Sequence, residues 1–168
     1  MIDTSNITNS EAKRLIDTFL GNRAINREYY ELVPDESFDF RMVNNSERRS
    51  DSPRESLAHQ IGVQQDYINA VITGILKFET GDDKSMKNLS KTELLQKLTE
   101  VDEKLVEILS DEDIGNKTII SPWSKIPSSA IKSLWGLDSH EILHTGCNLA
   151  VMDHLNIKRF ESLKNIWG

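Results

Sequence analysis

The sequence contains a single cysteine, Cys147, among its 168 residues. An internal disulfide is therefore excluded, and the chain fits a reducing compartment. No stretch approaches the roughly 18 consecutive apolar residues of a membrane-spanning helix. The polar first residues, MIDTSNITNSEAK, have no hydrophobic signal core. We therefore expect a cytoplasmic protein with no membrane partner.

The chain also lacks an excess of positive charge. It has 20 Lys and Arg residues and 27 Asp and Glu residues, which gives a formal net charge of −7. Nucleic-acid binding requires clustered basic side chains for the phosphates, so we expect no nucleic-acid partner. One local cluster consists of Arg48, Arg49 and Arg54. Three acidic residues are interleaved with it: Glu47, Asp51 and Glu55. We interpret this segment as a solvated loop.

Four segments have the apolar periodicity of amphipathic helices, and no segment has a convincing strand pattern. They run from about Ser10 to Leu32, from Ser52 to about Leu76, from Ser90 to about Ile108, and from about Ser128 to Leu155. Capping boxes mark the second start, SPRE, and the third, SKTE. The segment KTII is a candidate for a short extended piece.

These segments predict an all-α fold, a four-helix bundle formed by a single domain over residues 1–168. Long connections are expected between helices one and two and between helices three and four. The second segment has a wide apolar arc, which indicates more than one buried surface and is compatible with a subunit contact as well as the core.

The fourth segment contains the stretch HEILHTGCN at positions 140–148. Its apolar seam is expected to pass through Leu134, Leu137, His140, His144, Cys147, Val151 and His154. Two imidazoles and the only thiol would then occupy positions where leucines are expected. A buried polar group without a partner costs roughly 1–3 kcal/mol, so these side chains need partners.

A divalent metal ion is one such partner, because neutral imidazole nitrogens bind zinc and related ions. His140 and His144 are four residues apart on a helix, which places their Cβ atoms about 5–6 Å from each other. The remaining histidine outside the fourth segment is His59. Three protein ligands would leave one coordination position open for water or substrate. The residues alone leave an alternative open, in which carboxylates or backbone carbonyls satisfy the histidines.

Three neighbours of the histidine pair have separate interpretations. Cys147 is either a fourth ligand that closes the site or a small core residue beside the ion. His154 lies a rise of about 10 Å beyond Cys147, too far for the same ion, and is favoured near a helix C-terminus by the dipole. Glu141 follows a candidate ligand but points about 100° away from it, so we expect it beside the site or at the surface.

These motifs resemble those of the DinB/YfiT-like metalloenzymes over nearly the whole chain. LVPDESFDFR is similar to the family's segment between helices one and two, and SPRESLAHQIGVQQDYINAVITG to its second helix. HEILHTGC followed by LAVMDHLN is similar to its closing HxxxH helix. The resemblance implies a non-sequential helix order, a divalent metal ion on His59, His140 and His144, and frequently a homodimer. We expect zinc or nickel, although imidazole also suits iron and manganese.

The better-understood members of that family are thiol-dependent, among them transferases of bacillithiol and a mycothiol-dependent maleylpyruvate isomerase. The resemblance therefore implies an S-transferase whose partners are a small-molecule thiol and an electrophile. Two alternatives remain: a hydrolase that uses metal-bound hydroxide, and a non-enzymatic, metal-binding dimeric stress protein. The family's Arg-Gly-Gln after the last ligand is Thr145, Gly146 and Cys147 here, and no catalytic residue or general base can be named.

Overall fold

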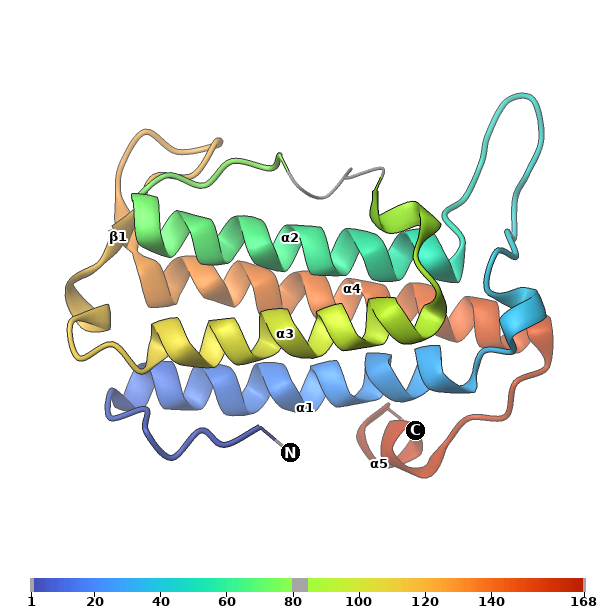
Figure 1. Ribbon diagram of the computed structural model, residues 1–168, viewed down its shortest axis with the longest axis horizontal. Helices are drawn as coiled ribbons and strands as arrows, with labels where there is room; N and C mark the ends of the chain where they lie inside the picture. The colour runs from blue at the N-terminus through green and yellow to red at the C-terminus, as the bar shows by residue number, and fades with distance from the viewer. Residues whose placement is uncertain (1, 80–84, 168) are drawn as a thin grey trace.

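The computed structural model describes residues 2–79 and 85–167 of the chain. In this part of the chain, four long helices lie side by side: α1 (Ser10–Leu32), α2 (Pro53–Thr73), α3 (Lys91–Leu109) and α4 (Ala130–Leu155) (Figure 1). A short helix that was not predicted, α5 (Glu161–Trp167), follows α4. The prediction of a mostly helical fold is confirmed. No described helix combines the length and the apolar character needed to cross a lipid bilayer.

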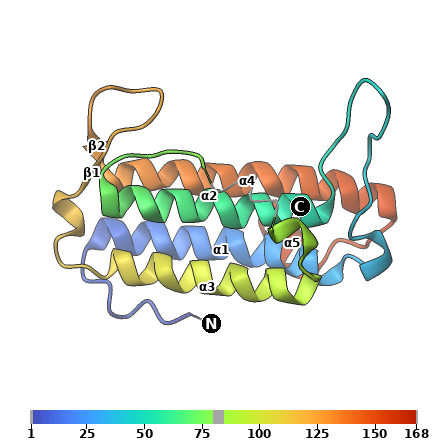
Figure 2. The same ribbon diagram turned by 45° about the horizontal axis from the view of Figure 1, so that its top comes forward.

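The long helices are not arranged in chain order. α4 packs against both α1 and α2, and α3 packs against α2 and α1 on the other side, so α1 and α2 lie across a diagonal. α1 and α4 run in one direction, whereas α2 and α3 run in the other (Figures 1 and 2). The long connections expected after the first and third helices are present at residues 33–52 and 110–129. This order makes α2 and α4 direct neighbours.

The ends of the helices follow local signals in the sequence. Ser52 Oγ accepts the Glu55 N–H, while the Glu55 carboxylate accepts the Ser52 N–H at 3.1 Å, and the same reciprocal pair occurs between Ser90 and Glu93. Both predicted capping boxes are therefore confirmed. α2 ends earlier than expected, because Gly74 adopts a left-handed φ of 78° and closes the helix.

Within residues 2–79 and 85–167, three one-turn 3-10 helices and two short strands occupy the connections. The 3-10 helices are η1 (Asp35–Ser37), η2 (Met86–Asn88) and η3 (Ile114–Asn116). β1 (Thr118–Ile119) pairs antiparallel with β2 (Ser128–Ser129), and Ile120 bridges to Ile75 just beyond α2. The extended character of KTII is thus confirmed, whereas the fourth helix begins two residues later than expected. These pairings tie the end of α2 to the start of α4.

The hydrophobic core lies between the four long helices. Its largest fully buried side chains include Phe19, Tyr29, Tyr30, Phe38, Leu57, Leu94, Leu98 and Leu105. Both sides of the wide apolar arc of α2 are buried within this single chain, through Ile61 and Ile68 on one side and Val63, Tyr67 and Ala70 on the other. Contacts within one chain therefore account for the width of the arc, and a homodimer stays a prediction.

Two arginines of the basic cluster, Arg49 and Arg54, form ion pairs with carboxylates. Arg54 forms a bidentate pair with Asp39 at 2.7 and 3.0 Å. Glu55 pairs with Arg49 at 2.7 Å and with Arg41. The interpretation of this segment as a solvated loop is confirmed for Arg48 and Arg49 and is wrong for Arg54, which lies in the first turn of α2.

Glu55 should contribute to stability in a pH-dependent way. The hydrogen bond from Arg41 is the main cause that lowers the pKa of Glu55 from 4.5 to about 2. A carboxylate with a lowered pKa in the folded state stabilises the protein above the unfolded pKa, and the contribution disappears as the pH falls through the folded pKa. We expect Glu55→Gln to lower the free energy of unfolding at pH 7 by about 1–3 kcal/mol, measured by urea denaturation.

The difference between the wild type and Glu55→Gln should shrink as the pH falls from 4.5 towards 2. Glu93→Gln is the matched control, because Glu93 has the same place in the capping box of α3 and contacts no arginine in the described residues. Equal losses in the two variants would show that the arginine pairing contributes nothing.

Candidate metal centre

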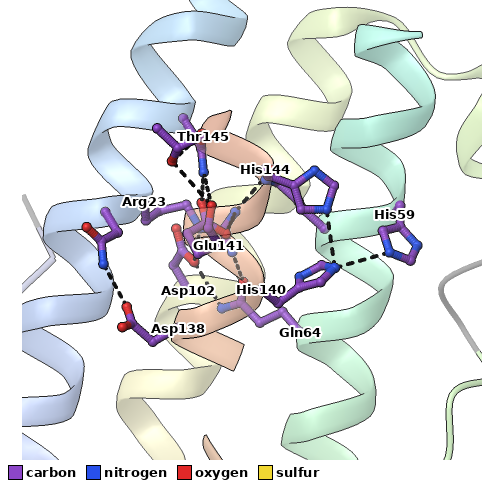
Figure 3. Close-up of polar contacts among 12 residues, drawn as sticks. Arg23, His59, Gln64, Asp102, Asp138, His140, Glu141, His144 and Thr145 are labelled. Carbon is purple, nitrogen blue, oxygen red and sulfur yellow. Dashed lines mark hydrogen bonds and ion pairs between the residues drawn. The ribbon is translucent and has the colours of Figure 1, made fainter. Parts of the chain in front are cut away.

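α2 and α4 place three imidazoles at one point. His59 lies on α2, and His140 and His144 on α4 face it (Figure 3). The Nε2 atom of His140 lies 3.2 Å from Nε2 of His59 and 3.2 Å from Nε2 of His144. One nitrogen atom from each ring lies within 4.8 Å of the other two, and all three residues are half-buried. The structure thus brings together the three histidines proposed as metal ligands.

The convergence of these nitrogens suits a cation better than a proton network. The Nε2 atom of a neutral imidazole has either one proton or one lone pair, yet Nε2 of His140 faces two other nitrogens at the same distance. A tetrahedral zinc ion with Zn–N bonds of about 2.0–2.1 Å sets its ligand atoms about 3.3–3.4 Å apart. The observed 3.2 Å contacts are close to that spacing, so the donor set fits a divalent ion.

Burial keeps two of the rings in the neutral form that a metal requires. Burial is the main cause that lowers the pKa of His140 to about 4, followed by the charges of His59 and Arg23. Burial likewise lowers the pKa of His144 to about 3, with further contributions led by His140 and His59. Both imidazoles are therefore uncharged at neutral pH, and each has one ring nitrogen whose lone pair is available for coordination.

A hydrogen-bond chain orients His144. Its Nδ1 atom lies 2.9 Å from Ser56 Oγ, and the fully buried Tyr30 donates its hydroxyl proton to the same oxygen at 3.0 Å. When Nε2 of an imidazole binds an ion, Nδ1 carries the proton and donates it to such a partner. Ser56 therefore determines that Nε2 of His144, and not Nδ1, faces the centre. The Nδ1 atom of His140, by contrast, is buried without a hydrogen-bond partner among the described residues.

A buried polar network adjoins the histidines and links all four long helices (Figure 3). Arg23 of α1 lies 3.1 Å from the Glu141 carboxylate of α4 and 3.4 Å from the Asp102 carboxylate of α3. Arg23 also donates to Gln64 of α2 at 2.6 Å, and Gln64 donates to Asp102 at 2.9 Å. Burial raises the pKa of both carboxyls, against the opposing charge of Arg23.

Polar side chains also form much of the contact between α1 and α4. Asn26 of α1 donates to the Glu141 carboxylate at 2.7 Å and to the Glu141 carbonyl at 2.9 Å. The amide oxygen of Asn26 accepts hydrogen bonds from Thr145 at 3.1 Å and from Asn148 at 2.8 Å. The stripe of α4 that faces α1 therefore depends on hydrogen bonds as well as on apolar burial.

The predicted seam of α4 is confirmed at Leu134, Leu137 and Val151, which are buried, and is wrong at two other positions. Cys147 and His154, expected in the seam, are exposed, whereas Glu141 is fully buried. The reason is that α4 packs between two helices and has two buried stripes: Glu141 lies on the stripe towards α1, and His140 and His144 on the stripe towards α2. In the described residues Cys147 does not join the three ligand atoms, so the fourth-ligand interpretation is not supported.

Sequence reasoning missed Arg23, Asp102 and Gln64 as partners in the network. A signal was present, because Arg23 follows Phe19 by four residues in the apolar period of α1, and Asp102 follows Leu98 by four in that of α3. Charged residues are rarely fully buried unless they are paired. The identity of the partners was not accessible, since each lies on a different helix.

Comparison with known proteins adds no relative: no family model matches the chain, and no curated protein matches its sequence. Membership in the DinB/YfiT-like family therefore stays a prediction.

Removing Arg23 should destabilise the fold strongly. Arg23→Met keeps a similar volume but leaves two buried carboxyls without their cation, which costs about 3–5 kcal/mol when one partner of a buried pair is removed. Lys13→Met is the control, because Lys13 lies on the same helix and pairs with Asp17 at the surface, where an ion pair contributes about 1 kcal/mol or less. Urea denaturation measures both, and similar losses would contradict the importance of the buried cluster.

The Ser56 hydrogen bond should strengthen metal binding. We expect Ser56→Ala to weaken the affinity for Zn²⁺ about 10–100-fold, since the partner of a ligating imidazole commonly contributes that much. Competition with a chromophoric chelator measures the affinity. Ser139→Ala is the control, because Ser139 is exposed on α4 and bonds the Trp135 carbonyl. An affinity of Ser56→Ala within twofold of the wild type would show that Ser56 does not orient the ligand.

Proposed function

We propose that this protein is a four-helix bundle of the DinB/YfiT-like kind that holds one divalent metal ion on His59, His140 and His144. We further propose that it acts as a thiol-dependent S-transferase on small electrophiles, with zinc or nickel as the ion. The observation that carries the proposal is the convergence of three imidazole nitrogens from two helices, with Nε2 contacts of 3.2 Å.

The helix order supports the bundle assignment. The resemblance implied a non-sequential order, and α1 and α2 do lie across a diagonal, with α4 between them. The ligands are also distributed as the motifs implied, with His59 on the second long helix and an HxxxH pair on the last long one.

The accessibility of the centre supports an exchangeable ligand rather than a purely structural site. Structural zinc sites are usually closed by four protein ligands, whereas catalytic sites keep an open position. Here three half-buried histidines form the group, and the single cysteine of the chain, Cys147, is exposed outside it. A divalent ion in such a site lowers the pKa of a coordinating thiol, so that the thiolate forms at neutral pH.

The proposed reaction is balanced without an oxidant or reductant. The thiol proton leaves to solvent, the sulfur forms a bond to an electrophilic carbon, and the leaving group departs with its bonding electrons. The protein's own residues hold the centre: Ser56 and Tyr30 orient His144, and Arg23 anchors Glu141, the residue after His140.

The test combines metal analysis with thiol binding. We expect the purified protein to bind one divalent ion per chain, and the Co²⁺-substituted protein to change its visible absorption when small thiols are added. The triple variant His59→Ala, His140→Ala and His144→Ala should lose the ion and the spectral response. His154→Ala should keep both, because His154 is exposed at the end of α4 and stacks on Phe40 instead.

A protein that binds the ion but never changes its spectrum with any thiol would overturn the transferase proposal. Turnover of an ester or amide without thiol would favour the hydrolase alternative. A coordination sphere that thiols and water cannot enter would favour the non-enzymatic stress protein. Sedimentation analysis would test the expected homodimer separately.

A further inference from the structure

Tyr67 packs its ring into the protein while its hydroxyl oxygen stays accessible. The residue is 4% exposed, yet its hydroxyl oxygen is not among the buried side-chain atoms of the described residues that lack a hydrogen-bond partner. Such a hydroxyl can exchange a hydrogen bond with water for one with a ligand. Tyr67 lies two helical turns after His59 on α2, and residues at that spacing share a face of the helix. Its ring therefore lies on the same side of α2 as the metal centre.

Gly136 of α4 provides the space for this hydroxyl. A Cβ atom at position 136 would lie 2.7 Å from the Tyr67 oxygen, closer than a carbon and an oxygen can approach. Glycine within a helix costs about 1 kcal/mol relative to alanine, and Gly136 lies well inside α4. The Tyr67 hydroxyl is a physical reason for this glycine.

The hydroxyl lies near the three histidines. Gly136 precedes His140 by one helical turn, and Cβ positions four residues apart are about 5–6 Å from each other. Adding the 2.7 Å from position 136 to the oxygen places the hydroxyl within about 9 Å of the His140 Cβ atom. A small molecule held at the centre spans such a distance.

Neighbouring aromatic rings hold Tyr67 in this position. The Phe78 ring packs edge-on against it with centroids 6.0 Å apart, and Trp123 stacks on Phe78 with centroids 6.1 Å apart. Burial raises the pKa of the Tyr67 phenol, so the hydroxyl stays protonated at neutral pH. It can therefore donate a hydrogen bond to a carboxylate or carbonyl oxygen.

We propose that the Tyr67 hydroxyl, placed by Gly136, binds an acceptor group on the small thiol held at the three-histidine centre. This inference rests on the proposed function, and it assigns a chemical class to the thiol: one with a carboxylate or carbonyl a few bonds from the sulfur. Tyr67 is then a specificity-determining residue that contacts the substrate without binding the metal ion.

The experiment compares two probe thiols on the Co²⁺-substituted protein. 3-Mercaptopropionate has a carboxylate, whereas 1-propanethiol lacks it at a similar chain length. We expect Tyr67→Phe to weaken the binding of 3-mercaptopropionate about 10–100-fold, the usual size for a hydrogen bond to a charged group, and to leave the binding of 1-propanethiol within twofold of the wild type. Gly136→Ala should have the same selective effect, because its methyl group displaces the hydroxyl while alanine favours the helix.

Tyr29→Phe is the matched control. The Tyr29 hydroxyl is buried without a hydrogen bond in the described residues, and it lines a small void between α1, α4 and α5 with Leu149 and Phe160. This variant should bind both thiols like the wild type, and every variant should keep one ion per chain.

The outcomes separate the two proposals. Wild-type protein that binds the ion but neither thiol overturns the proposed function and this inference together. Wild-type protein that binds both thiols, with Tyr67→Phe and Gly136→Ala unchanged towards 3-mercaptopropionate, overturns the Tyr67 inference and leaves the metal-dependent function standing. Equal weakening of the binding of both thiols would show that Tyr67 shapes the site without contacting the carboxylate. That result would overturn the Tyr67 inference as well.

Discussion

One buried guanidinium constrains the arrangement of the four long helices. Arg23 contacts Glu141 on α4 at 3.1 Å, Asp102 on α3 at 3.4 Å and Gln64 on α2 at 2.6 Å. A buried charge is tolerated when its partners surround it in good geometry, and misplacing one partner leaves an uncompensated charge that costs several kcal/mol. Apolar side chains permit small sliding movements between helices. The polar network around Arg23 tolerates few such sliding movements, so it sets how the helices align along their length.

The same network positions the candidate metal centre. Glu141 directly follows His140, and Gln60, whose amide oxygen lies 3.5 Å from Arg23, directly follows His59. One side chain of α1 therefore contacts the neighbours of ligands on two different helices. The rings themselves need an additional constraint, which the chain Tyr30–Ser56–His144 supplies for one of them. Metal centres depend on such outer contacts to hold ligand orientation, and here the scaffold and the centre share their polar core.

The shape of the centre follows from the helix order. α2 and α4 run in opposite directions side by side (Figure 2), so residues that follow His59 on α2 lie opposite residues that precede His140 on α4. Tyr67 and Gly136 meet for this reason, at a contact where a Cβ atom would be 2.7 Å from the hydroxyl. The interface between the two helices thus has three imidazoles at one level and a phenol at the next, which under the proposed function would give a small ligand two distinct points of contact.

The sequence by itself determined what short-range physics controls. Capping residues and apolar periods located the four long helices, because caps and side-chain faces depend on residues three or four positions apart. The HxxxH spacing and the scarcity of other histidines identified the three candidate ligands. Only the tertiary structure decided which stripe of α4 faces which neighbour, and this is why Glu141 is buried while Cys147 is exposed. A helix between two partners has two buried faces, and its own period cannot distinguish them. The pairing of Arg23 with carboxylates on two other helices, and of Tyr67 with Gly136, likewise depends on the helix order, which arises from contacts between residues distant in the chain.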